Sequence, residues 1–174
     1  MRILSDSELE EILLTGLNRA RLISLRTYNT MFLQYHTGVR LSEVMVDRWE
    51  ILPNGTYYLN TRKYNQPRTF TPDQIPLIWR EAIALNDDSL FCNVHSTYER
   101  RFREIFSTDC YTVGEKRLVS HIWRHNWAKK ERIKLGSNEA VRQSLGEKRL
   151  SSALNYIASD IVARPWQTVN LSWT

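Results

Sequence analysis

The tripeptide Pro53-Asn54-Gly55 places a tight turn between two runs of β-forming residues, at 49–52 and 56–63. A second turn signal at residues 64–67 precedes a short strand pattern at residues 68–72. An antiparallel hairpin followed by a third short strand satisfies both signals. The chain is therefore predicted to contain a small antiparallel sheet of about three strands.

Helical periodicity dominates the rest of the chain. Ser5 and Glu8 form a capping box ahead of an apolar stripe, and Gly38 and Gly136 are typical signals for the ends of two later helices. Helices are expected at residues 8–20, 21–38, 40–49, 73–85, 96–106 (behind a capping box at Ser96 and Glu99), 119–136, 137–146 and 149–162. Residues 107–116 are expected to form a loop, and residues 163–174 show no firm period. The pattern predicts a mostly helical α+β domain with the sheet inserted after the third helix.

Length and charge limit the possible functions. At 174 residues the chain fits one domain, and no apolar run approaches the roughly 18 residues of a membrane-spanning helix. The N-terminus lacks the apolar core of a signal peptide, and Cys92 and Cys110 lack metal-ligand spacing, which favours a reducing compartment. The net charge is +5, and residues 115–149 hold ten Lys and Arg against four Glu. This excess is modest evidence for a polyanionic partner, although a solvated helix face gives the same charge.

Individual motifs are weak evidence for a site. Arg40 follows the helix that ends at Gly38, a setting that suits a bound anion, although an Arg at a helix start is usually solvated. His121 and Arg124 share one helical face at i, i+3 spacing. Tyr156 sits in an apolar pattern that by itself indicates a core residue.

Two further groups complete the set of candidates. Lys63 closes the predicted hairpin, where a lysine can either reach into a cleft or protect a strand edge. His121 and His125 have H-x-x-x-H spacing, but the acidic residue of the H-E-x-x-H zinc motif is absent, so no metal site is expected.

Taken together, these motifs resemble the catalytic domain of the tyrosine recombinases, the phage-integrase family. In chain order they are G-x-R-x-S-E at 38–43, the hairpin lysine with an arginine five residues later, H-x-x-R-H at 121–125, L-G-x at 145–147 and a tyrosine nine residues further on. The resemblance covers residues 5–158. It implies catalytic roles for Arg40, Lys63, His121, Arg124 and Tyr156, with Glu43 supporting the site and position 147 completing it.

The resemblance also implies the chemistry. Tyr156 is expected to attack a DNA phosphodiester and form a 3′-phosphotyrosyl bond without metal, ATP or any cofactor. Arg40 and Arg124 are expected to bind the non-bridging oxygens, Lys63 to protonate the leaving 5′-oxygen, and His121 to accept the tyrosine proton or bind the phosphate. Two alternatives are a type IB topoisomerase-like enzyme and a degenerate recombinase that only binds DNA.

Position 147 departs from the family pattern, because the family has His or Trp there and this chain has Glu147. Three interpretations remain open. Glu147 pairs with Arg124, Lys148 or Arg149 and orients a cation; it is protonated beside the phosphate and donates a hydrogen bond; or it marks a weakened enzyme.

Basic residues outside the catalytic set are expected to contact DNA phosphates. They are Arg68, Lys129, Lys130, Arg132, Lys134, Lys148 and Arg149. His125, Trp123 and Trp127 are expected to be packing residues.

The resemblance further implies an organisation and a set of partners. Residues 1–158 are expected to form the catalytic domain, and residues 159–174 a tail that docks in cis or onto a neighbouring protomer through Trp166 or Trp173. The N-terminal domain with which the family clamps DNA is absent from this chain, so the chain is expected to be either a minimal recombinase or a fragment. The expected partner is double-stranded DNA, bound as a tetramer on two sites in the cytoplasm.

Overall fold

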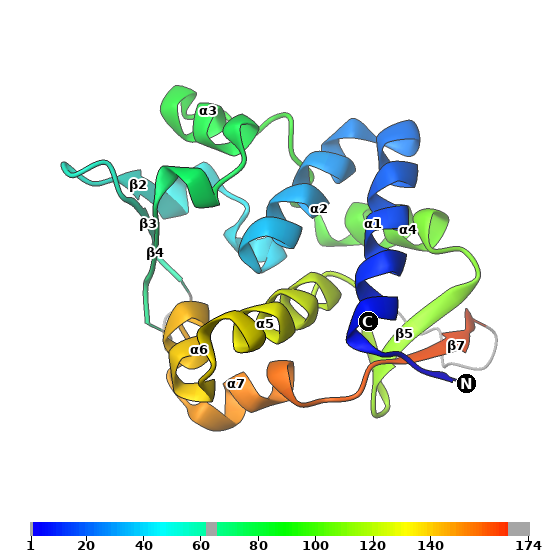
Figure 1. Cartoon of the computed structure of the whole chain (residues 1–174). Helices are drawn as coiled ribbons and strands as arrows, with labels where there is room; N and C mark the ends of the chain where they lie inside the picture. Colours follow the sequence, from blue (N-terminus) through cyan, green and yellow to red (C-terminus); the bar gives the residue numbers. More distant parts are fainter. Residues whose placement is uncertain (1, 62–65, 167–174) are drawn as a thin grey trace.

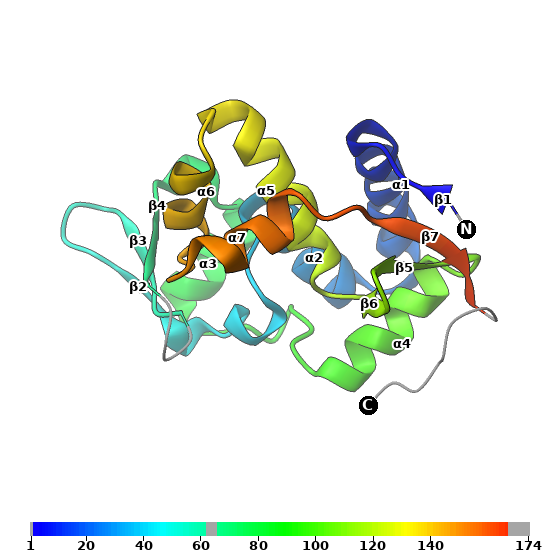
Figure 2. The same ribbon diagram turned by 90° about the horizontal axis from the view of Figure 1, so that it is seen from below.

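A computed structural model describes residues 2–61 and 66–166 of the chain. Two antiparallel sheets lie at opposite ends of the molecule, with helices between them (Figure 1). Figure 2, turned by 90°, shows the same separation. The described helices are α1 (Asp6–Ile23), α2 (Leu25–Thr37), α3 (Leu77–Leu85), α4 (His95–Ile105), α5 (Ile122–Leu135), α6 (Asn138–Leu145) and α7 (Leu150–Ile157). This is the mostly helical α+β domain that the sequence predicts.

Local capping explains several helix boundaries. The Ser5 side chain accepts a hydrogen bond from the backbone N–H of Glu8, and the Glu8 carboxylate accepts one from the backbone N–H of Ser5, as the capping box predicts. Gly38 and Gly136 end α2 and α5 in the left-handed conformation. The capping box predicted at Ser96 is wrong, because α4 begins one residue earlier and Val94 occupies its N-cap.

The predicted three-stranded sheet is confirmed. Strands β2 (Trp49–Ile51), β3 (Tyr57–Leu59) and β4 (Arg68–Phe70) form an antiparallel meander in the order β2-β3-β4. The helix expected at 40–49 is instead two 3₁₀ turns, Leu41–Glu43 and Val46–Arg48, leading into β2. The inner face of the sheet packs with α3 around Trp49, Phe70 and Trp79 in one apolar cluster.

A second sheet was not predicted. Strands β1 (Arg2–Ile3), β5 (Asp109–Val113), β6 (Lys116–Leu118) and β7 (Val162–Pro165) pair in the order β1-β7-β5-β6. The loop expected at 107–116 is therefore mostly strand, and the last expected helix ends at Ile157 instead of 162. One face of this sheet carries Tyr111, Leu118 and Ala163. These side chains belong to the largest apolar cluster of the described residues, which also holds residues of α1, α2, α4 and α5.

The segment after α7 is anchored by β7. Trp166 follows directly, is buried, and donates its indole N–H to the backbone carbonyl of Phe106 at 2.9 Å, while the guanidinium of Arg103 lies 5.0 Å from its ring centre. Trp173 lies outside the described residues. None of the described helices is both long and apolar enough to span a membrane.

Candidate active site

Tyr156 and His121 come together at the start of α5 and the end of α7. The Tyr156 hydroxyl lies 3.1 Å from Nδ1 of His121, within hydrogen-bonding distance. The Tyr156 ring packs with Leu145 and Ala153 in a small apolar cluster between α5, α6 and α7. The side chain therefore has a buried ring and a hydroxyl held by an imidazole, a geometry that suits proton transfer from the phenol.

His125 lies behind the tyrosine. Its ring centre is 4.8 Å from that of Tyr156, and the side chain is buried. Burial, together with the charges of His121 and Lys129, lowers the pKa of His125 to about 3. His125 is therefore neutral at physiological pH and packs behind the tyrosine, in agreement with the packing role expected of it.

Arg124 lies at the centre of the site, fully buried. Its Nη1 donates to the carbonyl of Gly38 at 2.8 Å, and its Nη2 donates to the carbonyl of Leu145 at 2.9 Å and to Oε1 of Glu147 at 3.0 Å. Its guanidinium carbon lies 4.9 Å from the centre of the Tyr156 ring, in cation–π geometry. One arginine thus connects the end of α2, the end of α6 and the tyrosine.

Close approach of α2 to α5 requires glycine at position 38. Gly38 has φ 67°, and a Cβ there would lie 2.8 Å from the Trp127 ring. Only glycine adopts this conformation at such short range without strain. The turn delivers the Gly38 carbonyl to Arg124 and places Arg40 two residues later, beside the same site.

Glu147 joins Arg40 to Arg124. Nη2 of Arg40 donates to Oε1 of Glu147 at 2.5 Å, and the same oxygen accepts from Arg124. Glu43 accepts from the backbone N–H of Arg40 at 2.8 Å and forms an ion pair with its Nη1 at 3.6 Å. Arg40, Glu43 and Glu147 are only 8%, 0% and 4% exposed, so this cluster is closed to solvent.

The loop that carries Glu147 is held against the three-stranded sheet. Gly146 has φ 72°, and a Cβ there would lie 2.6 Å from the carbonyl oxygen of Gln66. The Gln66 N–H donates to the Gly146 carbonyl at 2.9 Å, and Arg142 donates to the Glu147 carbonyl at 2.7 Å. Lys63, the predicted general acid, lies outside the described residues.

Arg68 is bonded to backbone carbonyls of two helices. Its Nε donates to the Ser144 carbonyl at 2.7 Å and its Nη2 to the Thr37 carbonyl at 2.6 Å, and its guanidinium carbon lies 4.9 Å from the Trp127 ring centre. Burial, together with the charge of Arg124, lowers the pKa of Arg68 to about 9, so the group stays cationic at neutral pH. Arg68 therefore fastens β4 to α2 and α6, and its contact with DNA phosphates stays a prediction.

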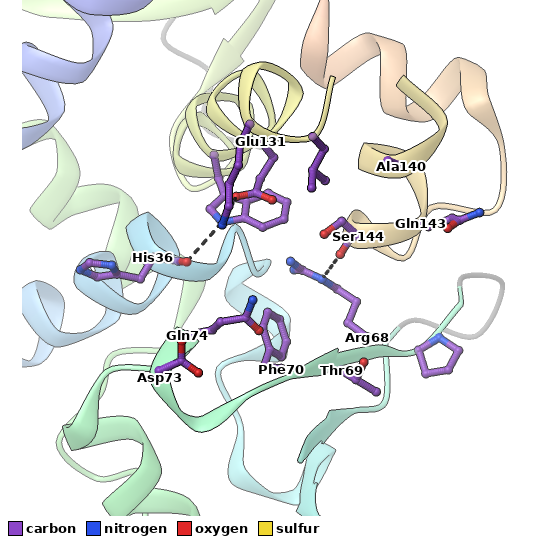
Figure 3. A pocket seen from close by; sticks show the side chains of 14 residues that line it. His36, Arg68, Thr69, Phe70, Asp73, Gln74, Glu131, Ala140, Gln143 and Ser144 are labelled. Carbon is purple, nitrogen blue, oxygen red and sulfur yellow. Dashed lines mark hydrogen bonds and ion pairs between the residues drawn. The ribbon is translucent and has the colours of Figure 1, made fainter. Parts of the chain in front are cut away.

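Arg68 also borders a cavity between β4, α5 and α6, of about 660 Å³ (Figure 3). The cavity is lined by charged groups of both signs, the acidic Asp73 and Glu131 and the basic Lys134. The predicted catalytic residues that the structure describes (Arg40, His121, Arg124, Glu147 and Tyr156) do not line it, so this cavity lies apart from the tyrosine.

The other basic residues fall into two groups. Lys129 donates to the carbonyls of Ile157 and Ser159, at 3.1 and 2.9 Å, and so caps the end of α7 instead of facing outward. The partly exposed Lys130 donates to Glu10 and Tyr35, Arg132 donates to Asn138, and Lys134 lies 4.0 Å from Glu131. Lys148 and Arg149 are exposed beside Glu147, and their DNA contacts remain predictions.

The four-stranded sheet supplies a wall beside the tyrosine that the sequence does not predict. A cavity of about 760 Å³ reaches Tyr156 and His121 and is lined on the sheet side by Thr112, Arg117 and Arg164. Thr112 pairs with Arg117 in the β5–β6 register, so both occupy the face opposite the apolar core. The signal was Gly114-Glu115 between two short strand-like runs, a two-residue hairpin turn.

Within residues 2–61 and 66–166, no group of three or more His, Cys, Asp or Glu side chains is placed to hold a metal ion. Cys92 and Cys110 are both buried and unpaired with each other.

Comparison with known proteins shows the fold. No protein-family model and no curated protein matches the chain. Among solved structures, it is similar to the XerH site-specific recombinase bound to palindromic difH substrate in a post-cleavage complex, with a TM-score of 0.57 and 21% identity over 90% of this chain and 50% of that one. A pre-cleavage complex of XerH with difH gives a TM-score of 0.55 and 23% identity over 88% of this chain and 49% of that one. The chain has the recombinase fold predicted from its motifs, and it spans about half the length of the XerH chains.

Proposed function

We propose that this chain is the catalytic domain of a site-specific DNA recombinase that cleaves and rejoins strands through a 3′-phosphotyrosyl intermediate. The observation that carries the proposal is the convergence of three distant motifs. The hydroxyl of Tyr156 lies 3.1 Å from His121, its ring lies over Arg124, and Arg124 shares a carboxylate oxygen with Arg40. The recombinase fold and the net positive charge support the same assignment.

Each group has a defined task in the proposed reaction. His121 accepts the phenolic proton as the oxygen of Tyr156 bonds to phosphorus, and the bond from phosphorus to the 5′-oxygen breaks. Arg40 and Arg124 bind the non-bridging oxygens, where negative charge accumulates. The departing 5′-oxygen takes a proton from Lys63, an assignment that rests on the sequence motif. Rejoining reverses these steps, because a phenolate is a good leaving group.

The proposal includes partners and organisation. The substrate is double-stranded DNA, and the working assembly is a tetramer on two sites. Residues 1–158 form the catalytic unit, and the exposed Lys148 and Arg149 contact the phosphate backbone next to the cleavage position.

Covalent trapping on nicked DNA tests the proposal. The substrates are duplexes with the sequence of the DNA that flanks the coding sequence, each with a nick near the tested cleavage position. After cleavage the short fragment that carries the free 5′-hydroxyl diffuses away, so the strand cannot be rejoined. The chain should form a denaturant-resistant adduct with one of these duplexes, and Tyr156→Phe should reduce the adduct to background. Tyr58→Phe, on a half-buried tyrosine of β3, is the matched control and should leave the adduct intact. An adduct that survives Tyr156→Phe would assign the chemistry to another residue.

One observation favours a second candidate, a DNA-binding module without catalysis. Both arginines expected to bind the phosphate already bond Glu147. Sequence-specific binding with no adduct on any nicked duplex would support this function instead.

A further inference from the structure

The carboxylate of Glu147 occupies the point at which the two catalytic arginines converge. Its Oε1 accepts from Nη2 of Arg40 at 2.5 Å and from Nη2 of Arg124 at 3.0 Å. Guanidinium groups bind carboxylate and phosphate oxygens through the same N–H donors and with the same geometry. The Glu147 oxygen therefore stands where a non-bridging oxygen of a phosphate would be bound.

The donors at this point are not all satisfied by Glu147. Nη1 of Arg40 and Nε of Arg124 are buried and make no hydrogen bond with the described part of the chain. Arg40 is 8% exposed and Arg124 is fully buried, so solvent does not easily compensate these groups. A tetrahedral oxyanion presents several oxygens and can use more of these donors than one carboxylate oxygen does.

The site carries a net positive charge of one, but Glu147 occupies the donors that a second anion would need. Arg40, Arg68 and Arg124 contribute three positive charges, and Glu43 and Glu147 two negative ones. A phosphodiester bound while Glu147 stays would place two anions on the same donors. Two like charges held on the same donors repel each other, both at a protein surface and in water. The phosphate and the Glu147 carboxylate thus exclude each other.

The displaced carboxylate has a place to go. Glu147 follows Gly146, whose left-handed backbone ends α6, and precedes the exposed cations Lys148 and Arg149. A rotation of the Glu147 side chain toward these cations keeps its charge compensated while it leaves the arginines. The required movement is confined to one loop between α6 and α7.

We propose that Glu147 is an internal competitor for the phosphate site, holding Arg40 and Arg124 in the free protein until an entering phosphodiester displaces it. Glu147 is then a positioning residue that sets how tightly the site binds an oxyanion. The identity of the oxyanion as a DNA phosphate rests on the proposed function, whereas the competition itself does not.

Titration with inorganic phosphate, followed by calorimetry at constant ionic strength, tests the competition without DNA. Glu147→Gln keeps the shape of the side chain but removes its charge, and should bind phosphate about tenfold more tightly than the parent chain. Glu10→Gln is the matched control, because Glu10 also accepts from several donors (Lys130, Tyr35 and Asn126) but lies away from the arginines. It should leave phosphate affinity unchanged.

Adding Arg40→Gln to Glu147→Gln should abolish the gain, which locates the anion at the arginines. Glu147→Asp, which shortens the side chain, should show a smaller gain and serves if the glutamine variant does not fold. Equal phosphate affinity in the parent and both position-147 variants would overturn the proposal, as would a gain that survives loss of Arg40. A gain in phosphate affinity without any DNA adduct would sustain the competition and refute the recombinase function. A DNA adduct without any gain in phosphate affinity would support the recombinase function and overturn the competition.

Discussion

The two halves of the candidate site are built differently. The arginine half, comprising Arg40, Arg124 and Glu147, is enclosed, and its charges are compensated by protein groups. The tyrosine half, comprising Tyr156 and His121, borders a cavity of about 760 Å³ and holds its hydroxyl by one hydrogen bond. The electrostatic half is thus held by several buried polar contacts, whereas the hydroxyl of the nucleophilic half makes few. Mutations on the two sides should therefore separate stability from chemistry.

The largest effect on stability is expected for Arg124→Met. The change leaves the carbonyls of Gly38 and Leu145 without their donor and leaves Glu147 with a single arginine. Removing one partner of a buried ion pair costs about 3–5 kcal/mol, and denaturant unfolding should show a loss of this size. The partly exposed Arg101, paired with Glu104 on α4, is the control, because Arg101→Met should cost less than about 1 kcal/mol. Similar losses in both variants would erase the distinction between the halves.

His125 makes the tyrosine half sensitive to acid. Its folded pKa of about 3 lies below the ordinary value near 6.5. Below about pH 6.5 the unfolded chain therefore binds a proton that the folded chain refuses, and stability falls as the pH drops toward 3. Between about pH 7.5 and 4.5 the His125 contribution should amount to roughly 2–3 kcal/mol. His125→Phe should remove that share of the pH dependence in unfolding measurements, and an unchanged pH profile would contradict the assignment.

Tyr156→Phe sharpens the comparison in the opposite direction. The variant keeps the ring in its apolar cluster and loses only the hydrogen bond to His121. Its free energy of unfolding should fall by about 0.5–1.5 kcal/mol, although its DNA adduct should disappear. A thermal or denaturant midpoint that drops as far as that of Arg124→Met would show that the hydroxyl is structural.

The smallest effect is expected in the salt dependence of DNA binding. Lys129 caps α7, so Lys129→Met should leave the slope of log affinity against log salt unchanged. Arg149 is exposed, and Arg149→Met should lower that slope by about 1, the contribution of one phosphate contact. If filter-binding titrations instead show a lower slope for Lys129→Met and an unchanged slope for Arg149→Met, Lys129 must leave the end of α7 when DNA binds.

The sequence predicts those parts of the fold whose signals are local. The capping box at Ser5, the helix ends at Gly38 and Gly136, and the turn at Asn54-Gly55 act over a few residues and are found where expected. The sequence does not predict the four-stranded sheet because β5 is stabilised by pairing with β7, some fifty residues later in the chain. Such pairing leaves little trace in a short strand read alone.

The candidate site divides in the same way. The motifs predict the residue types at positions 40, 121, 124 and 156, and the fold brings these positions together. The sequence allows three interpretations of Glu147, because its contact with Arg40 spans 107 positions in the chain. The internal hydrogen bonds of Arg68 could not be predicted, since a buried arginine and an exposed one look alike in a sequence.

The backbone hydrogen bond from Gln66 to Gly146 has a practical consequence for protein engineering. It ties the segment between β3 and β4 to the loop that precedes Glu147, and Gly146 leaves no room there for any side chain. The two segments therefore form one module for transplantation. A chimaera that exchanges only the β3–β4 segment, or lengthens it by a residue, would also displace position 147. A β3–β4 segment from another protein should therefore be grafted together with the residues of that protein that correspond to 144–147.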